Sequence, residues 1–126
     1  MRKIITTANA PAPIGPYNQA VLANDTLYLS GQIGLNPLSM EMVEGGIKEE
    51  AEQVMENLKA VLEAAEMTFS QVVKTSIFLS DMEDFGQVNE VYAAYFNDDS
   101  SPARETIAAK TLPKNVKVEI SMIAVK

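Results

Sequence analysis

The chain has 126 residues, of which 47% are hydrophobic, and it carries a formal net charge of −7 at pH 7. It contains no cysteine, histidine or tryptophan, which excludes disulfides, thiolate or imidazole catalysis, and zinc sites built on thiolate or imidazole ligands. The acidic charge would repel a phosphate backbone, so the composition argues against nucleic-acid binding.

The length predicts a single domain over residues 1–126, because a chain of this size is expected to form one hydrophobic core. No apolar run is long enough to span a bilayer. The basic start, Met1-Arg2-Lys3, is followed by only a short apolar pair before Thr6-Thr7, so it does not develop into a signal peptide. We therefore expect a cytoplasmic protein.

The first part of the chain predicts a short strand followed by a stiff loop. A β-prone run covers residues 4–7, and Pro11, Pro13 and Pro16 then fix several φ angles and exclude helix. This extended loop ends at Tyr17. The tyrosine either packs on its own sheet or is presented to a binding site, and the sequence leaves both open.

Residues 20–23 and 26–33 predict a β-hairpin, because Asn24-Asp25 between them tolerates left-handed backbone. By alternation, one face of the second strand carries Gly31 together with Leu27, Leu29 and Ile33. A glycine inside a strand marks either a bulge or a place where a ligand or another part of the chain comes close.

Two helices are predicted. Residues 47–67 repeat apolar side chains at the three-and-four spacing of a helix packed on a core. Residues 72–79 predict a strand, and a second helix follows over about 84–96. Asn89 falls at the margin of the apolar arc of that second helix, where an amide is either a satisfied core group or a group offered to a cleft.

The last part of the chain predicts two strands, over residues 104–110 and 116–125, joined by a turn. In the final strand Glu119 lies on the face opposite to the apolar residues. The predicted order of strands and helices, β-β-β-α-β-α-β-β, indicates an α+β fold in which two helices cover one face of one sheet.

The common catalytic motifs are missing from the sequence. There is no glycine-rich phosphate loop, nucleophile elbow or metal-spaced cluster, and acidic residues near position 84 are ordinary for a helix N-terminus. The candidates that remain are Arg104, Glu119, Asn89, Tyr17 and the backbone around Gly31. An arginine can bind a carboxylate through two parallel charge-assisted hydrogen bonds. A structural ion pair with a carboxylate such as Glu105 or Glu119 is the alternative.

Several segments, in order, resemble the RidA-type reactive intermediate deaminases. They are 12–20 (APIGPYNQA), 29–32 (LSGQ), Val88-Asn89 with the following aromatic residues, 101–104 (SPAR), 112–114 (LPK) and 118–120 (VEI). The resemblance covers nearly the whole chain. It implies a chorismate-mutase-like fold with a mixed sheet, assembled as a homotrimer with its sites in clefts between subunits.

The resemblance also implies an activity, the hydrolytic deamination of 2-iminobutanoate and 2-iminopropanoate to 2-oxo acids and ammonia, without cofactor or metal. Such a protein protects pyridoxal-phosphate enzymes, which release these reactive imines. The other readings are a non-catalytic module that binds a small carboxylate, a ribonuclease or translation inhibitor, and a chaperone-like holdase.

The resemblance assigns a role to each of six residues. Arg104 would clamp the substrate carboxylate, assisted by the backbone N–H of Thr106. Glu119 would position the attacking water, and Gly31 would offer a backbone contact. Tyr17 would close the pocket across the subunit interface. Asn89 would help to hold either the arginine or the pocket wall.

The chain departs from the family pattern at Glu105, where relatives carry a small residue. Alternation along a strand would direct Glu105 away from Arg104. A bulge that turned Glu105 inward would neutralise the arginine and weaken carboxylate binding.

Overall fold

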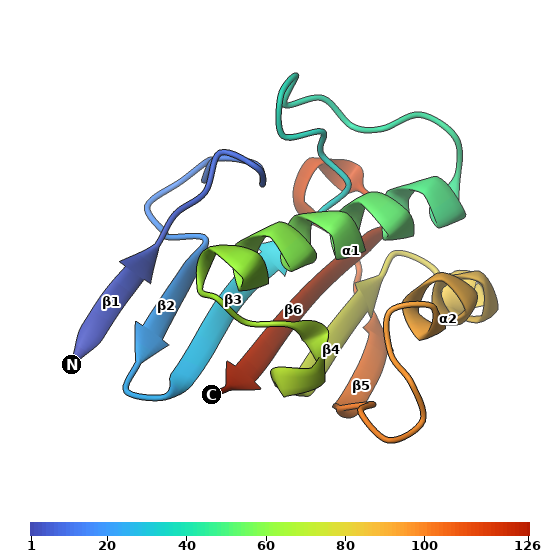
Figure 1. The fold of residues 1–126 in the computed structure, drawn as a ribbon. Helices are drawn as coiled ribbons and strands as arrows, with labels where there is room; N and C mark the ends of the chain where they lie inside the picture. The colour runs from blue at the N-terminus through green and yellow to red at the C-terminus, as the bar shows by residue number, and fades with distance from the viewer.

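The strands form one six-stranded sheet, which is shown for residues 1–126 by the computed structural model in Figure 1. They are β1 (Arg2–Ile5), β2 (Ala20–Ala23), β3 (Thr26–Gln32), β4 (Val72–Leu79), β5 (Ala103–Ala108) and β6 (Val118–Val125). Their order is β1-β2-β3-β6-β4-β5. Only β4 and β5 run parallel, joined by a crossover that contains a helix, so the sheet is mixed as predicted.

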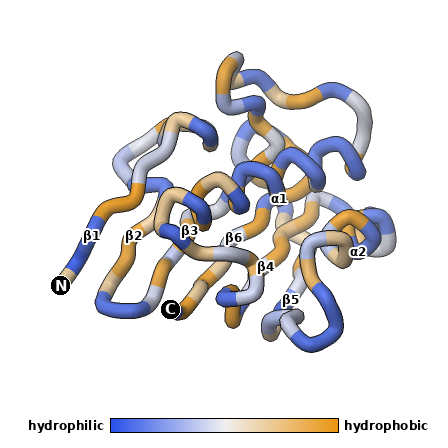
Figure 2. The backbone as a smooth tube through the Cα atoms, in the orientation of Figure 1, coloured by the Kyte–Doolittle hydropathy of each residue, from blue (hydrophilic) through white to orange (hydrophobic).

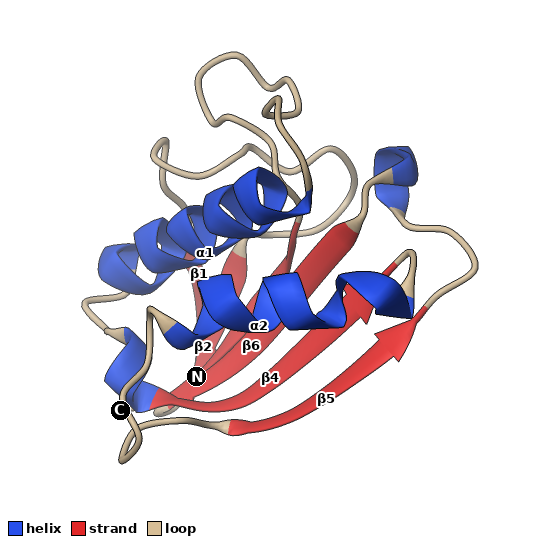
Figure 3. Cartoon of the chain, turned by 90° about the vertical axis from the view of Figure 1, so that its right-hand side faces the viewer, coloured by secondary structure: helices blue, strands red, loops and turns tan.

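The helices α1 (Ile47–Ala64) and α2 (Phe85–Ala93) lie on the same face of the sheet (Figures 1 and 3). Along α1 and β6 hydrophobic residues recur with hydrophilic ones between them (Figure 2), and most of the hydrophobic ones belong to a buried core of 24 residues. The opposite face of the sheet has no helix over it. This confirms the predicted α+β fold. No helix in the structure combines the length and apolar character needed to cross a bilayer.

Both helices are shorter than predicted. After α1 the backbone of Glu66 takes a positive φ of 58°, and the Met67 N–H donates to the Leu62 carbonyl, which caps the helix before residue 67. After α2 the next turns tighten, with Phe96 N–H donating to the carbonyl three residues earlier. Neither ending had a glycine or proline to signal it.

Strand ends also differ from the prediction. The first strand covers Arg2–Ile5 instead of residues 4–7, and β5 ends at Ala108 instead of 110. The final strand begins at Val118, because a short 3-10 helix (Pro113–Asn115) precedes it and two of its residues take positive φ. Val116, expected in the strand, is buried in a smaller apolar cluster with Ile33.

A β-bulge interrupts β3 and corrects the predicted alternation. Leu29 pairs with Met122 and Gln32 with Ile120, so β3 contains one extra residue over this stretch. Gln32 is consequently buried, while Gly31 lies half-buried at the irregularity and no longer shares the face of Leu29. The bulge directs this part of β3 toward the start of β6.

Candidate active site

A cavity of about 350 Å³ lies where β3, β6 and the β1–β2 loop meet. Tyr17 contributes to it from the loop, Gly31 from the bulge and Glu119 from β6. Three of the six predicted site residues are therefore brought together within one chain. We call this hollow the Glu119 cavity.

Gly31 and Glu119 lie in close contact. A methyl group placed on Gly31 would lie 2.7 Å from Oε2 of Glu119 and 2.9 Å from its carboxyl carbon. The bulge and the close approach, which the sequence offered as alternatives for Gly31, therefore occur together. The carboxylate has no ion-pair or hydrogen-bond partner in the chain, and burial raises the pKa of Glu119 above its ordinary value.

Tyr17 rests on its own loop at the rim of this cavity. Its hydroxyl accepts a hydrogen bond from the Ile14 N–H at 3.3 Å, and its ring lies against Gly15. The side chain is 46% exposed, so it does not pack into the core of its sheet. Tyr17 thus has one face free for a ligand or another subunit.

Arg104 occupies a second hollow, of about 250 Å³, beside α2. The centre of its guanidinium lies 5.0 Å from the ring centroid of Tyr92 and 5.5 Å from that of Phe85. The two ion pairs of the chain, Lys48–Glu90 and Lys74–Glu105, do not include it. The structural ion pair considered for Arg104 is absent, and its charge is available to an anion. We call this hollow the Arg104 hollow.

Asn89 also lines the Arg104 hollow. It is half-buried, and its side chain makes no hydrogen bond within the chain, so it is not a satisfied core amide. Thr106 follows two residues after Arg104 in β5 and lies on the same face of the strand. Its hydroxyl oxygen is buried without a partner, but Thr106 lines neither hollow.

The aromatic platform beneath Arg104, formed by Phe85 and Tyr92, was missed as a functional feature. The Tyr92 hydroxyl donates to Oγ1 of Thr75 at 3.0 Å, which fixes the ring, and burial raises the pKa of Tyr92 despite the opposing effect of that bond and of Arg104. The two aromatic residues are two helical turns apart and share a face of α2. That spacing was the available signal, although it is also that of ordinary core residues.

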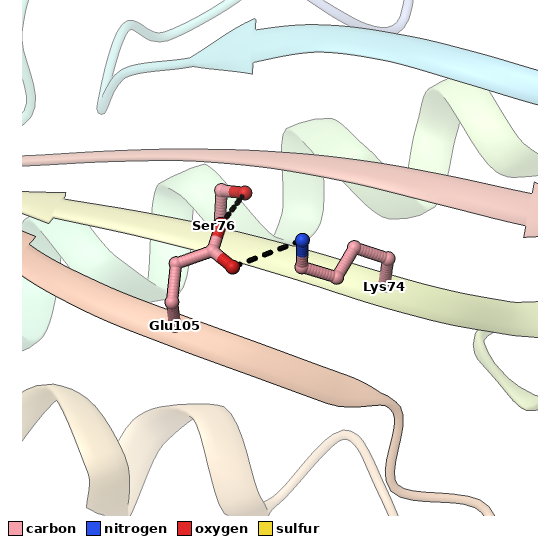
Figure 4. Close-up of polar contacts among 3 residues, drawn as sticks. All are labelled: Lys74, Ser76 and Glu105. Carbon is pink, nitrogen blue, oxygen red and sulfur yellow. Dashed lines mark hydrogen bonds and ion pairs between the residues drawn. The ribbon is translucent and has the colours of Figure 1, made fainter.

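Glu105 points onto the open face of the sheet (Figure 4), whereas Arg104, its neighbour in β5, lies over the rings of α2 on the other face. Its carboxylate accepts a hydrogen bond from the Ser76 hydroxyl and lies 2.9 Å from the Lys74 ammonium. The hydrogen bond from Ser76, and then Lys74, lower the pKa of Glu105. The carboxylate therefore leaves the guanidinium of Arg104 un-neutralised, as alternation predicted.

Arg104 and Glu119 face opposite sides of the sheet. Arg104 lies over two rings of α2, on the helix-covered face, whereas Glu119 stands between the fully buried Val118 and Ile120 of β6 and so points to the other face. One chain therefore does not bring the two groups together at one place. A substrate that contacts both groups would need the second group from another subunit.

Comparison with known proteins identifies the family. The sequence model described as Endoribonuclease L-PSP matches residues 7–126. The chain is 51% identical over 126 residues to the mouse protein named 2-iminobutanoate/2-iminopropanoate deaminase, covering 100% of this chain and 93% of that one. A structure from Yersinia pestis, described as a member of the conserved Rid protein family, has 44% identity, a TM-score of 0.96 and 100% coverage of both chains.

A further similar structure is that of E. coli TdcF with bound serine, which has 38% identity, a TM-score of 0.92 and 98% coverage of both chains. Relatives named as imine deaminases and structures of Rid proteins therefore match this chain over essentially its full length. The expected resemblance is confirmed, and the chain belongs to the Rid family, whose sequence model is described as Endoribonuclease L-PSP.

Proposed function

We propose that this protein hydrolyses 2-imino acids, with 2-iminobutanoate and 2-iminopropanoate as its substrates, to 2-oxo acids and ammonia. The observation that carries the proposal is the unpaired Arg104 guanidinium held over two aromatic rings. Two parallel hydrogen bonds from Arg104 would hold the substrate carboxylate, each contributing roughly 1.5–3 kcal/mol once water is excluded. The mouse relative named for this activity supports the assignment.

Glu119 would act on the imine carbon. The water that it holds gives one proton to Glu119 and attacks C2, forming a C–O bond while the π electrons of C=N move to nitrogen, which takes up that proton from Glu119. The C–N bond then breaks as the remaining hydroxyl proton passes to nitrogen, so that ammonia and the 2-oxo acid leave. The raised pKa of Glu119 favours this role, because a carboxyl that titrates nearer to neutral pH can accept a proton and return it.

The proposal includes a homotrimer in which the Arg104 hollow of one subunit faces the Glu119 cavity of its neighbour. The placement of the two groups on opposite faces of one sheet supports this arrangement, since no single chain can bring both to one small molecule. Tyr17 and Asn89 would then close the site from the two sides, and the backbone of Gly31 and Thr106 would contact the substrate.

Imine hydrolysis can be measured with 2-iminobutanoate formed in place by a threonine dehydratase and trapped by semicarbazide. The protein should reduce the trapped fraction, and Arg104→Met should abolish that effect. Glu105→Ala is the matched control, because it removes the next side chain of the same strand on the opposite face. Full activity of the Arg104→Met variant would refute the proposal.

Mixing inactive variants tests the shared site. Arg104→Met and Glu119→Gln should each be inactive, but co-refolded trimers of both should recover activity in about a quarter of their sites, where each half comes from a competent subunit. A site confined to one chain would recover none. Sedimentation measurements on the same samples establish whether the variants assemble.

A binding module without turnover is the second candidate, favoured by the E. coli TdcF structure that contains serine. In that case serine and other small carboxylates should bind in an Arg104-dependent manner, measurable by calorimetry, with no change in the trapped imine. Ribonuclease activity has less support, because the net charge of −7 and the lack of histidine disfavour it.

A further inference from the structure

The loop over residues 6–19 has few main-chain interactions of its own. Between β1 and β2, a single backbone–backbone hydrogen bond is formed within the loop, from the Tyr17 N–H to the Gly15 carbonyl. Pro11, Pro13 and Pro16 restrict the chain but cannot donate hydrogen bonds. Nevertheless this loop supplies one wall of the Glu119 cavity. The Asn18 and Gln19 carbonyls accept hydrogen bonds from Ser30 of β3, which holds the end of the loop against the sheet. The earlier part of the loop has no such backbone bond and must be held by a side chain.

The side chain of Gln19 is the group that does so. Its Oε1 accepts from the Thr7 N–H at 2.7 Å, and its Nε2 lies 3.0 Å from the Thr7 carbonyl, 3.2 Å from the Ala10 carbonyl and 2.9 Å from the Pro11 carbonyl. Gln19 is only 3% exposed and immediately precedes β2, so the amide is fixed to the sheet. It joins the start of the loop to its end.

A primary amide of this length offers an acceptor to the Thr7 N–H and two N–H donors to the three carbonyls around Nε2. A carboxylate offers no donor to the carbonyls, and an apolar side chain offers neither donor nor acceptor, so either would leave buried backbone groups unpaired. Gln19 also lines the Glu119 cavity itself. The residue therefore connects the folding of the loop with the shape of the candidate active site.

We propose that Gln19 is a positioning residue, which holds the loop over residues 6–19 so that Tyr17 stands at the rim of the Glu119 cavity. Its importance for turnover rests on the proposed imine hydrolysis, whereas the control of the loop does not. Ser30 holds residues 18 and 19, but only the Gln19 side chain holds Thr7, Ala10 and Pro11 to the end of the loop. Releasing it therefore frees the earlier part of the loop, including Ile14, whose N–H donates to the Tyr17 hydroxyl. Tyr17 then loses its fixed position relative to Glu119.

Hydrogen exchange tests the loop directly. Gln19→Met keeps the length and loses all four contacts, and Gln19→Asn keeps the amide on a shorter arm. We expect faster exchange in peptides covering residues 7–18 in both variants, more in Gln19→Met, with α1 unchanged. The control is Gln87→Met, which alters an exposed glutamine of α2 that makes no hydrogen bond. Unchanged exchange in the loop would overturn the proposal, as would faster exchange spread equally over the chain.

Kinetics distinguish positioning from simple structural support. Gln19→Asn should lower kcat/KM for 2-iminobutanoate about 10-fold. In a Tyr17→Ala background Gln19→Asn should lower kcat/KM much less, because each of the two substitutions removes the same contribution, that of a correctly placed Tyr17. If the fold-changes in kcat/KM of the two single substitutions multiply in the double variant, Gln19 does not act by positioning Tyr17. Failure of the wild type to hydrolyse imines would refute the proposed function, and the exchange result would still decide the role of Gln19.

Discussion

Gly31→Ala should separate activity from stability. The new methyl group would lie 2.7 Å from Oε2 of Glu119, and ordinary contact begins at 3.4 Å, so the carboxylate must move by about 0.7 Å, the difference between these distances. The atoms in the way belong to the end of a flexible side chain, and the φ of Gly31 is not left-handed, so the fold can adapt. We expect a loss of no more than about 1 kcal/mol in the free energy of unfolding, below the usual range for an overpacked core.

The same displacement should be costly for catalysis. A catalytic group misplaced by 1 Å can lower the rate about 100-fold, so Gly31→Ala should reduce kcat/KM for 2-iminobutanoate by about 10- to 100-fold. The assay is imine hydrolysis with semicarbazide trapping, run alongside urea unfolding. Gly86→Ala is the matched control: nothing lies within 4 Å of the added methyl, and alanine in α2 should stabilise the protein by about 0.5–1 kcal/mol without affecting turnover. Wild-type turnover in Gly31→Ala would refute the reasoning.

Substitutions at three further residues test the site geometry. At pH 7 Glu119→Gln should unfold at a higher urea concentration than the wild type, because folding raises the pKa of Glu119 and its charged form therefore destabilises the native state. The difference in urea midpoint should disappear as the pH falls below 4.5, the ordinary pKa of the carboxyl group. An equal difference in midpoint at pH 3 would contradict this. Tyr92→Phe should lower the free energy of unfolding by about 1 kcal/mol, because it leaves the Thr75 hydroxyl unpaired, but it should preserve carboxylate affinity. Tyr92→Leu removes one ring beneath Arg104 and should weaken carboxylate affinity by roughly 0.5–2 kcal/mol in calorimetric titration. Equal affinities of the two variants would argue against the cation–π contact. Glu105→Ala should leave KM for the imine unchanged, and a lower KM would mean that Glu105 does compete for the arginine.

The architecture was predictable because the spacing of apolar residues along a strand or helix indicates which side chains are buried. The alternation in β6 and the apolar stripe of α1 both identify residues of the single core, and the order of strands and helices was correct. The bulge in β3 was not predictable in detail, since it depends on pairing with β6, which lies far away in the sequence. The end of α1 depends on a non-glycine residue taking positive φ, for which Glu66 gives no signal, and the tightened turns after α2 have no signal in the sequence either.

The candidate site was predictable mainly as a set of residue types. Alternation correctly separated Arg104 from Glu105, and it put Glu119 opposite to the core. The separation of Arg104 and Glu119 on opposite faces of the sheet could not be predicted from local pattern, because it depends on which face of the sheet α2 covers. Gln19 was equally hidden, since a glutamine before a strand is ordinary until its four backbone contacts are known.

The placement of Arg104 and Glu119 on opposite faces has a consequence for enzyme kinetics. If catalysis needs both groups, a separated chain is inactive, and the rate per chain becomes a function of protein concentration. Dilution would then lower the specific activity reversibly, because the subunits dissociate. Progress curves started from a dilute stock would show a lag while the subunits associate. Imine hydrolysis would then occur only above a threshold protein concentration, which the affinity between subunits would set.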